Sequence, residues 1–198
     1  HALENGVTQV HSIDMAVWDN LPIFKRAKET DRLKIRTYYV SHISKRHELA
    51  QMITGDGKGD NWLRYGGIKV MVDGALGSGT AWFHKPYSDE PDNSGFPIYD
   101  IDELTNMLKE SHNYGHQLVI HGIGDKANDE ILRIVEEIGA KNSRVRIEHA
   151  QHLSPSSFDK FTDLGVTAAA HPYHVYDDGR FAEGRIGKER LAGTYAFK

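Results

Sequence analysis

The sequence contains no cysteine, which excludes disulfide bridges, thiolate zinc sites and a cysteine nucleophile. No apolar run approaches the roughly 20 residues that cross a bilayer as a helix, so no membrane segment is expected. An excess of basic residues is also missing, because 24 Lys and Arg stand against 28 Asp and Glu. This balance disfavours a nucleic-acid partner bound through electrostatics.

The composition itself is that of a globular protein, with 39% apolar and 26% charged residues among 198. This length predicts a single domain over residues 1–198 with a sizeable core. The sequence opens on His1 without a signal pattern and closes on an apolar, aromatic run. We therefore expect an excerpt of a longer protein, whose localisation is left open. Twelve histidines are the unusual feature.

Short β-rich runs alternate with helical periodicities along the chain, which is typical of repeated βα units around a parallel sheet. The expected strands are 7–11, 34–40, 67–72, 117–121, 144–149 and 166–170. The expected helices begin near residues 21, 44, 100, 126 and 155, and the last of them is expected to turn Phe158, Phe161 and Leu164 inward.

The alternation breaks at residues 73–99, where Gly and Pro recur without a period. This segment is predicted to form an irregular excursion over the rim of the sheet. Six strands with one long insertion suit either an open doubly wound sheet or part of a (β/α)8 barrel. The glycine-rich dinucleotide fingerprint is absent after the first strand, which disfavours the doubly wound sheet.

Several histidines end or directly follow an apolar strand: His11, His121, His149 and His171. In parallel α/β proteins these strand ends meet at the functional rim. Side-chain alternation places His121 and His149 on the inward face of their strands, and it turns Glu148 away, as a structural residue. Two converging neutral imidazoles suit a divalent transition metal.

Lys69 lies inside an otherwise apolar strand, where an ammonium group is costly to bury unless it is paired or neutralised. It could reach the rim or pair with Asp73. It could also form a Schiff base, or become a carbamate that ligates metal through oxygen.

Three motifs together resemble one family: GIKVMVDGALGSG at 67–79, VIHGIGDKA at 119–127 and RIEHAQH at 146–152. In this order they are similar to the amidohydrolase superfamily, closest to the amidohydrolase-3 group that includes YtcJ-like and exoenzyme regulatory proteins. The resemblance covers nearly the whole chain.

The resemblance implies a distorted (β/α)8 barrel that holds one or two divalent metals, with zinc expected, and hydrolyses C–N bonds through activated water. Lys69, His121 and His149 match family ligand positions, with Lys69 as a carbamate. The chain would cover about strands 2 to 7, with the long loop after the fourth barrel strand. The first-strand His-x-His pair and the eighth-strand catalytic Asp have no counterpart here, so no catalytic residue is assigned. We expect the excerpt alone to be inactive.

Asp73, His171 and His174 are candidate contacts for a small-molecule substrate, although Asp73 could equally be a capping residue and the two histidines part of a solvated loop. Rival readings are a Schiff-base aldolase barrel using Lys69 and a non-catalytic regulatory or binding protein on the same scaffold. Exposed edges of an incomplete barrel would allow homo-oligomers or an open, curved sheet. The aromatic side chains Trp82, Phe83 and Tyr87 are expected to pack the excursion against the barrel, although they could also close over a ligand. The remaining histidines are expected on the surface: His42, His47, His84, His112 and His116.

Overall fold

The computed structural model describes residues 1–13 and 20–196. It contains two compact units. The first comprises His1–Lys69 with Glu110–Leu118, and the second comprises Val70–Lys109 with Val119–Lys198. The prediction of a single domain over 1–198 stays a prediction.

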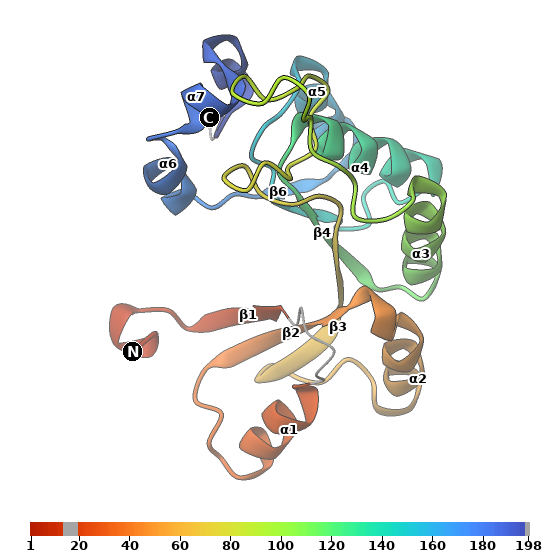
Figure 1. Cartoon of the computed structure of the whole chain (residues 1–198). Coiled ribbons are helices and arrows are strands. Elements are labelled where there is room, and N and C mark those ends of the chain that lie inside the picture. The colour runs from red at the N-terminus through yellow and green to blue at the C-terminus, as the bar shows by residue number, and fades with distance from the viewer. Residues whose placement is uncertain (14–19, 197–198) are drawn as a thin grey trace. The chain divides into compact units, whose positions relative to one another are not determined.

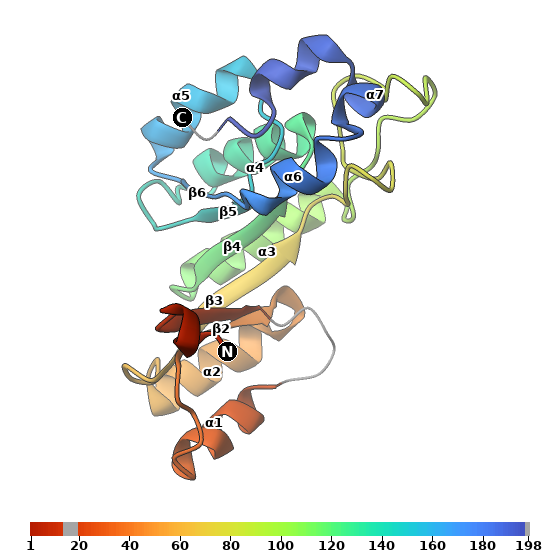
Figure 2. The same cartoon turned by 90° about the vertical axis from the view of Figure 1, so that its left-hand side faces the viewer.

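The first unit is a three-stranded parallel sheet with two helices. Gln9 pairs with Arg36 between β1 and β2, and Thr37 pairs with Leu63 between β2 and β3. Helices α1 and α2 lie on the same side of these strands (Figures 1 and 2). The elements are η1 (Leu3–Asn5), β1 (Gln9–Ile13), α1 (Leu21–Glu29), β2 (Arg36–His42), η2 (Ile43–Lys45), α2 (Arg46–Asp56) and β3 (Leu63–Met71).

The second unit contains three further parallel strands, in which Arg146 of β5 lies between Val119 of β4 and Thr167 of β6. Helix α4 lies on one side of these strands and α6 on the other (Figure 1). The elements that lie in or extend into this unit are α3 (Ile101–Asn113), β4 (Gln117–Gly122), α4 (Asp125–Glu137), β5 (Arg146–His149), α5 (Pro155–Leu164), β6 (Thr167–Ala169), α6 (Tyr173–Asp178), α7 (Ala182–Ile186) and η3 (Lys188–Gly193).

The strands follow one another in the order β1-β2-β3-β4-β5-β6. A parallel sheet in strict sequence order, with helical crossovers, is the arrangement of part of a (β/α)8 barrel and differs from a doubly wound sheet, whose order reverses. The predicted α/β class and partial barrel are therefore confirmed. Within the described residues, no helix is long and apolar enough to cross a membrane.

Helical periodicity explains how α4 and α5 pack. In α4, Ile131, Ile134 and Val135 recur at helical spacing and are fully buried. In α5 the prediction for Phe158 is wrong, because this side chain is 39% exposed. The buried face of α5 runs through Ser157 and Leu164, seven residues apart and thus on one stripe, and Phe158 lies about 100° away from Ser157 around the helix.

Residues 73–99 contain neither helix nor strand, so the irregular excursion is confirmed. It is packed rather than loose, since Phe83 and Tyr87 are buried in a core cluster with Ile123, Ala182 and Ile186. This confirms the packing expected of these two aromatic rings.

Two arginines bind the excursion to the elements after α6. The Arg185 guanidinium contacts Asp89 at 2.7 Å and Glu90 at 2.8 Å, and it lies 4.5 Å from the centre of the Tyr87 ring. Arg190 donates to the carbonyl of Pro86 at 2.8 Å. These contacts hold the excursion against α7 and η3 of the second unit.

Candidate metal centre

Four imidazoles gather where β4, β5 and β6 of the second unit end. His149 is central, and its ring centre lies 4.6 Å from that of His121, 4.6 Å from that of His171 and 5.2 Å from that of His174. The structure thus brings together His121 and His149, the two histidines predicted as ligands, and places beside them His171 and His174, predicted for substrate. Their roles stay predictions.

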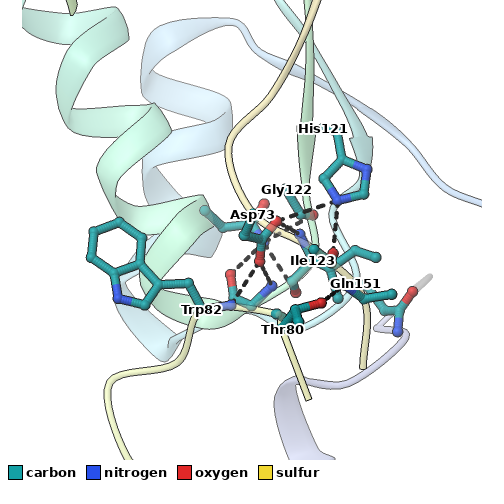
Figure 3. Close-up of polar contacts among 12 residues, drawn as sticks. Asp73, Thr80, Trp82, His121, Gly122, Ile123 and Gln151 are labelled. Carbon is teal, nitrogen blue, oxygen red and sulfur yellow. Dashed lines mark hydrogen bonds and ion pairs between the residues drawn. The ribbon is translucent and has the colours of Figure 1, made fainter. Parts of the chain in front are cut away.

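The orientation of His121 is set by the start of the excursion. Its Nε2 lies 2.9 Å from the carbonyl oxygen of Gly74 and 3.4 Å from Oδ1 of Asp73 (Figure 3). A carbonyl oxygen can only accept, so Nε2 carries the proton. In the neutral ring this leaves the lone pair on Nδ1, the form a metal ligand needs.

Asp73 is fully buried, and backbone groups occupy its carboxylate. It accepts hydrogen bonds from the N–H groups of Trp82 at 2.9 Å, Ile123 at 3.0 Å and Gly124 at 2.8 Å (Figure 3). These bonds join the excursion to the turn between β4 and α4. Asp73 therefore positions the backbone around His121, while its contact with substrate stays a prediction.

The backbone of His149 departs from strand geometry. Its φ is 71° and that of Ala150 is 43°, in the left-handed region that non-glycine residues seldom adopt. Such residues cost about 1–3 kcal/mol each and cluster at functional sites.

Glu148 is buried beside this point. It pairs with Arg146, and its Oε2 lies 3.5 Å from Nε2 of His171. A carboxylate thus borders the histidine cluster, which strand alternation alone did not indicate.

Two residues that follow β5 were missed by sequence reasoning. The Oε1 atom of buried Gln151 lies 3.2 Å from Nδ1 of His174. His152 is also buried, and its Nδ1 lies 2.9 Å from Oγ1 of Thr194. Burial, with a smaller contribution from the charge of Arg190, lowers the pKa of His152 to about 3. The only signal for either residue was its place in the RIEHAQH motif.

One histidine expected on the surface is buried instead. His116, in the first unit, is 4% exposed, and its Nε2 lies 2.9 Å from the carbonyl oxygen of Arg46. Burial lowers the pKa of His116. Its position just before β4 places it in the turn that packs on α2, which helical or loop context did not reveal.

Lys69 is 4% exposed within β3, opposite His42 in the register with β2. A lysine this buried must be paired, neutral or modified. It belongs to the first unit, and the prediction that it joins His121 and His149 stays a prediction.

The donor chemistry of the cluster fits a divalent transition metal. Imidazole is a preferred ligand of such metals, and the proton on Nε2 of His121 leaves its other nitrogen available. Across residues 1–13 and 20–196, however, no three His, Asp or Glu side chains are placed to hold one ion.

Parallel βα units in barrel order, with imidazoles at the strand ends, define the class of the protein as part of an α/β barrel. The chain matches the amidohydrolase family Amidohydro_3 over residues 4–198 and belongs to this family.

The relatives of the chain are longer proteins. It is 36% identical to Protein LONG AFTER FAR-RED 3 of Arabidopsis thaliana over 100% of this chain and 36% of that protein. It is 27% identical to the putative amidohydrolase YtcJ of Bacillus subtilis (strain 168) over 98% of this chain and 37% of that protein. The crystal structure of an uncharacterized metal-dependent hydrolase from Pyrococcus furiosus matches it with a TM-score of 0.90 and 29% identity, over 100% of this chain and 41% of that one. The chain thus spans little more than a third of these relatives.

Proposed function

We propose that this chain is part of a metal-dependent hydrolase that cleaves C–N bonds of the amide type in a small-molecule substrate. His121 and His149 would hold a divalent metal, with zinc expected, and a carbamylated Lys69 would be a further ligand. The observation that carries the proposal is the pair of imidazoles at the strand ends, whose ring centres lie 4.6 Å apart. The ring of His121 is held by the Gly74 carbonyl, which leaves its Nδ1 lone pair available.

The residues of the chain hold and orient the site. Donation from Nε2 of His121 to the Gly74 carbonyl fixes the ring and makes Nδ1 a better ligand. Asp73, His171 and His174 would contact the substrate. When bound, a divalent metal supplies Lewis acidity, which lowers the pKa of water and polarises a carbonyl group. The proton-transferring Asp implied by the family resemblance has no counterpart in this chain, so the activity is proposed for the whole protein.

The test is the metal content of the full-length parent protein, purified with zinc in the medium and measured by mass spectrometry. We expect near-stoichiometric metal in the parent and a loss of at least about tenfold in affinity in His121→Ala and His149→Ala. His84→Ala is the matched control, because His84 is an exposed residue paired with Asp129.

Retention of stoichiometric metal by both cluster variants would contradict the proposal. A metal-free parent that is fully active, and in which borohydride traps a substrate on Lys69, would instead support the Schiff-base alternative.

A further inference from the structure

Gln151 lies between the four histidines at the strand ends and the C-terminal part of the second unit. It is 2% exposed, and its two amide atoms face different neighbours. Its Nε2 side meets Asp178, Tyr195 and His152, and its Oε1 side meets His174. Which atom faces which neighbour decides the chemistry of His174.

All three neighbours on the Nε2 side are hydrogen-bond acceptors. The carboxylate oxygen of Asp178, at 3.0 Å, can only accept. The Tyr195 hydroxyl donates its own proton to Asp178, so its oxygen, 2.9 Å from Gln151, accepts.

His152 is the third acceptor. The hydroxyl of Thr194 donates to the carbonyl of Arg190 at 2.9 Å, so it accepts from Nδ1 of His152. The Nε2 of neutral His152 then carries a lone pair, 3.1 Å from the Gln151 amide nitrogen. The Gln151 NH2 group has two N–H bonds, so it donates to at most two of these three acceptors at a time. An amide oxygen in this place would face three acceptors and no donor, so the NH2 group must lie on this side.

The amide oxygen of Gln151 must therefore face His174. Because this oxygen can only accept, Nδ1 of His174 donates to it across 3.2 Å. A neutral imidazole has one N–H, so the Nε2 of His174 is left as a hydrogen-bond acceptor.

We infer that Gln151 is a positioning residue that holds His174 in the Nδ1–H form, so that His174 offers an acceptor to an N–H or O–H group of the ligand. A secondary amide N–H is the ligand group that fits the proposed C–N hydrolysis. Only this choice of ligand rests on the proposed function; the tautomer of His174 does not.

The tautomer is measured directly in the metal-free chain. In histidine labelled with 15N, long-range 1H–15N correlation at pH 8 distinguishes a protonated ring nitrogen from one with a lone pair. We expect His174, assigned by comparison with His174→Gln, to be protonated at Nδ1. A wild-type His174 protonated at Nε2 overturns the inference.

Two variants test the role of Gln151. Asp178→Asn leaves His152 and Tyr195 on the Nε2 side, where the lone pair of His152 still requires the NH2 group, so we expect the Nδ1–H form of His174 to persist. Gln151→Met removes the amide oxygen that accepts from Nδ1 of His174, so we expect the Nε2–H form of His174 to appear. The matched controls are Asp177→Asn, at a neighbouring carboxylate paired loosely with Arg180, and Gln9→Met, at an exposed glutamine beside His11.

If Gln151→Met fails to fold, the tautomer of His174 measured in the wild-type chain still tests the inference. A tautomer of His174 that stays unchanged in folded Gln151→Met would show that Gln151 does not position His174.

The ligand is tested with a matched pair of probes. N-methylacetamide has an N–H donor, and N,N-dimethylacetamide has none. We expect only the former to shift the Nε2 resonance of His174 in the wild-type chain. Equal shifts, or no shift with either probe, would overturn the ligand assignment, and neither result depends on whether the parent protein binds metal.

Discussion

His152 is an imidazole whose surroundings require it to stay neutral. Its Nδ1 donates to Thr194 and its Nε2 accepts from Gln151, so a second proton would meet another N–H group. Its pKa of about 3 in the folded chain lies below the usual value of 6.5, mainly because of burial. Between these two pH values the unfolded chain binds a proton that the folded chain does not.

The sign follows from this difference in protons bound. As the pH falls below 6.5, protonation of the unfolded chain at His152 lowers the free energy of unfolding by up to about 1.4 kcal/mol for each pH unit, until the pH reaches about 3. We predict that His152→Asn is less stable than the wild type at pH 7 but loses this contribution to the pH slope. Urea unfolding between pH 6.5 and 4.5 measures it, with the exposed His84→Asn as control, and identical slopes in the wild type and His152→Asn would refute the prediction.

Asp73 carries a second prediction at the scale of single residues. The Asp73 carboxylate accepts hydrogen bonds from three backbone N–H groups of other residues. In an asparagine at this position, the side-chain NH2 group would face at least one of these donors and could not accept from it. We predict that Asp73→Asn lowers the free energy of unfolding by about 1.5–3 kcal/mol, the range for hydrogen bonds to a charged group. Urea denaturation followed by circular dichroism measures the change, and Asp92→Asn, at an exposed site of the excursion, should change it little.

The elements of the second unit depend on one close backbone approach. A Cβ atom on Gly124, just before α4, would lie 2.0 Å from the carbonyl oxygen of Trp82 and 2.4 Å from its carbonyl carbon. Both contacts are to backbone, which cannot move without displacing the excursion. Glycine is therefore required where the excursion crosses the start of α4.

We predict that Gly124→Ala destabilises the chain by about 3 kcal/mol or more, the upper range for overpacking. The matched control is Gly55→Ala in α2, where a Cβ meets nothing within 4 Å and should stabilise the helix by up to about 1 kcal/mol. Thermal and urea unfolding of both variants give the comparison. Equal changes in the free energy of unfolding for the two variants would show that the close approach of Trp82 to Gly124 does not contribute to stability.

Element types were predictable because the patterns that define them are local. The 3.6-residue period of Ile131, Ile134 and Val135 specifies a helix by itself. Glu148 shows where such reasoning fails, since alternation assumes an extended backbone and β5 ends in a left-handed turn at His149 and Ala150. Two small helices, α6 and α7, were also missed, because neither has a long periodic face of its own.

At the scale of the whole molecule, the candidate site was predictable only in part. The proximity of His121 and His149 could be predicted, because both end apolar strands that a parallel sheet brings to one edge. Gln151, Thr194 and Tyr195 could not, because their contacts join segments about 40 residues apart. These contacts form because the segment after α7 lies against the residues that follow β5. The hydrophobic period of a helix or strand carries no information about such a contact.

The isolated chain has an open sheet and, in the part that the structure describes, an incomplete set of candidate metal ligands. Across the described residues no three His, Asp or Glu side chains are placed around one ion, and the strand order begins at β1 and ends at β6, whereas every strand of a closed barrel has two neighbours. We therefore predict that the 198-residue chain binds zinc at least about tenfold more weakly than the full-length parent, because an incomplete ligand set leaves the ion without its preferred geometry.

Competition with a chromogenic chelator measures zinc binding, and a panel of N-substituted amides measures hydrolysis, for the chain and the parent side by side. The parent carrying His121→Ala is the control, since it lacks one proposed ligand but keeps the complete barrel. We expect it to resemble the isolated chain in zinc binding. Size-exclusion chromatography of the chain reports whether its strand edges associate. A chain that binds zinc and hydrolyses amides as well as its parent would show that the site is complete within these residues.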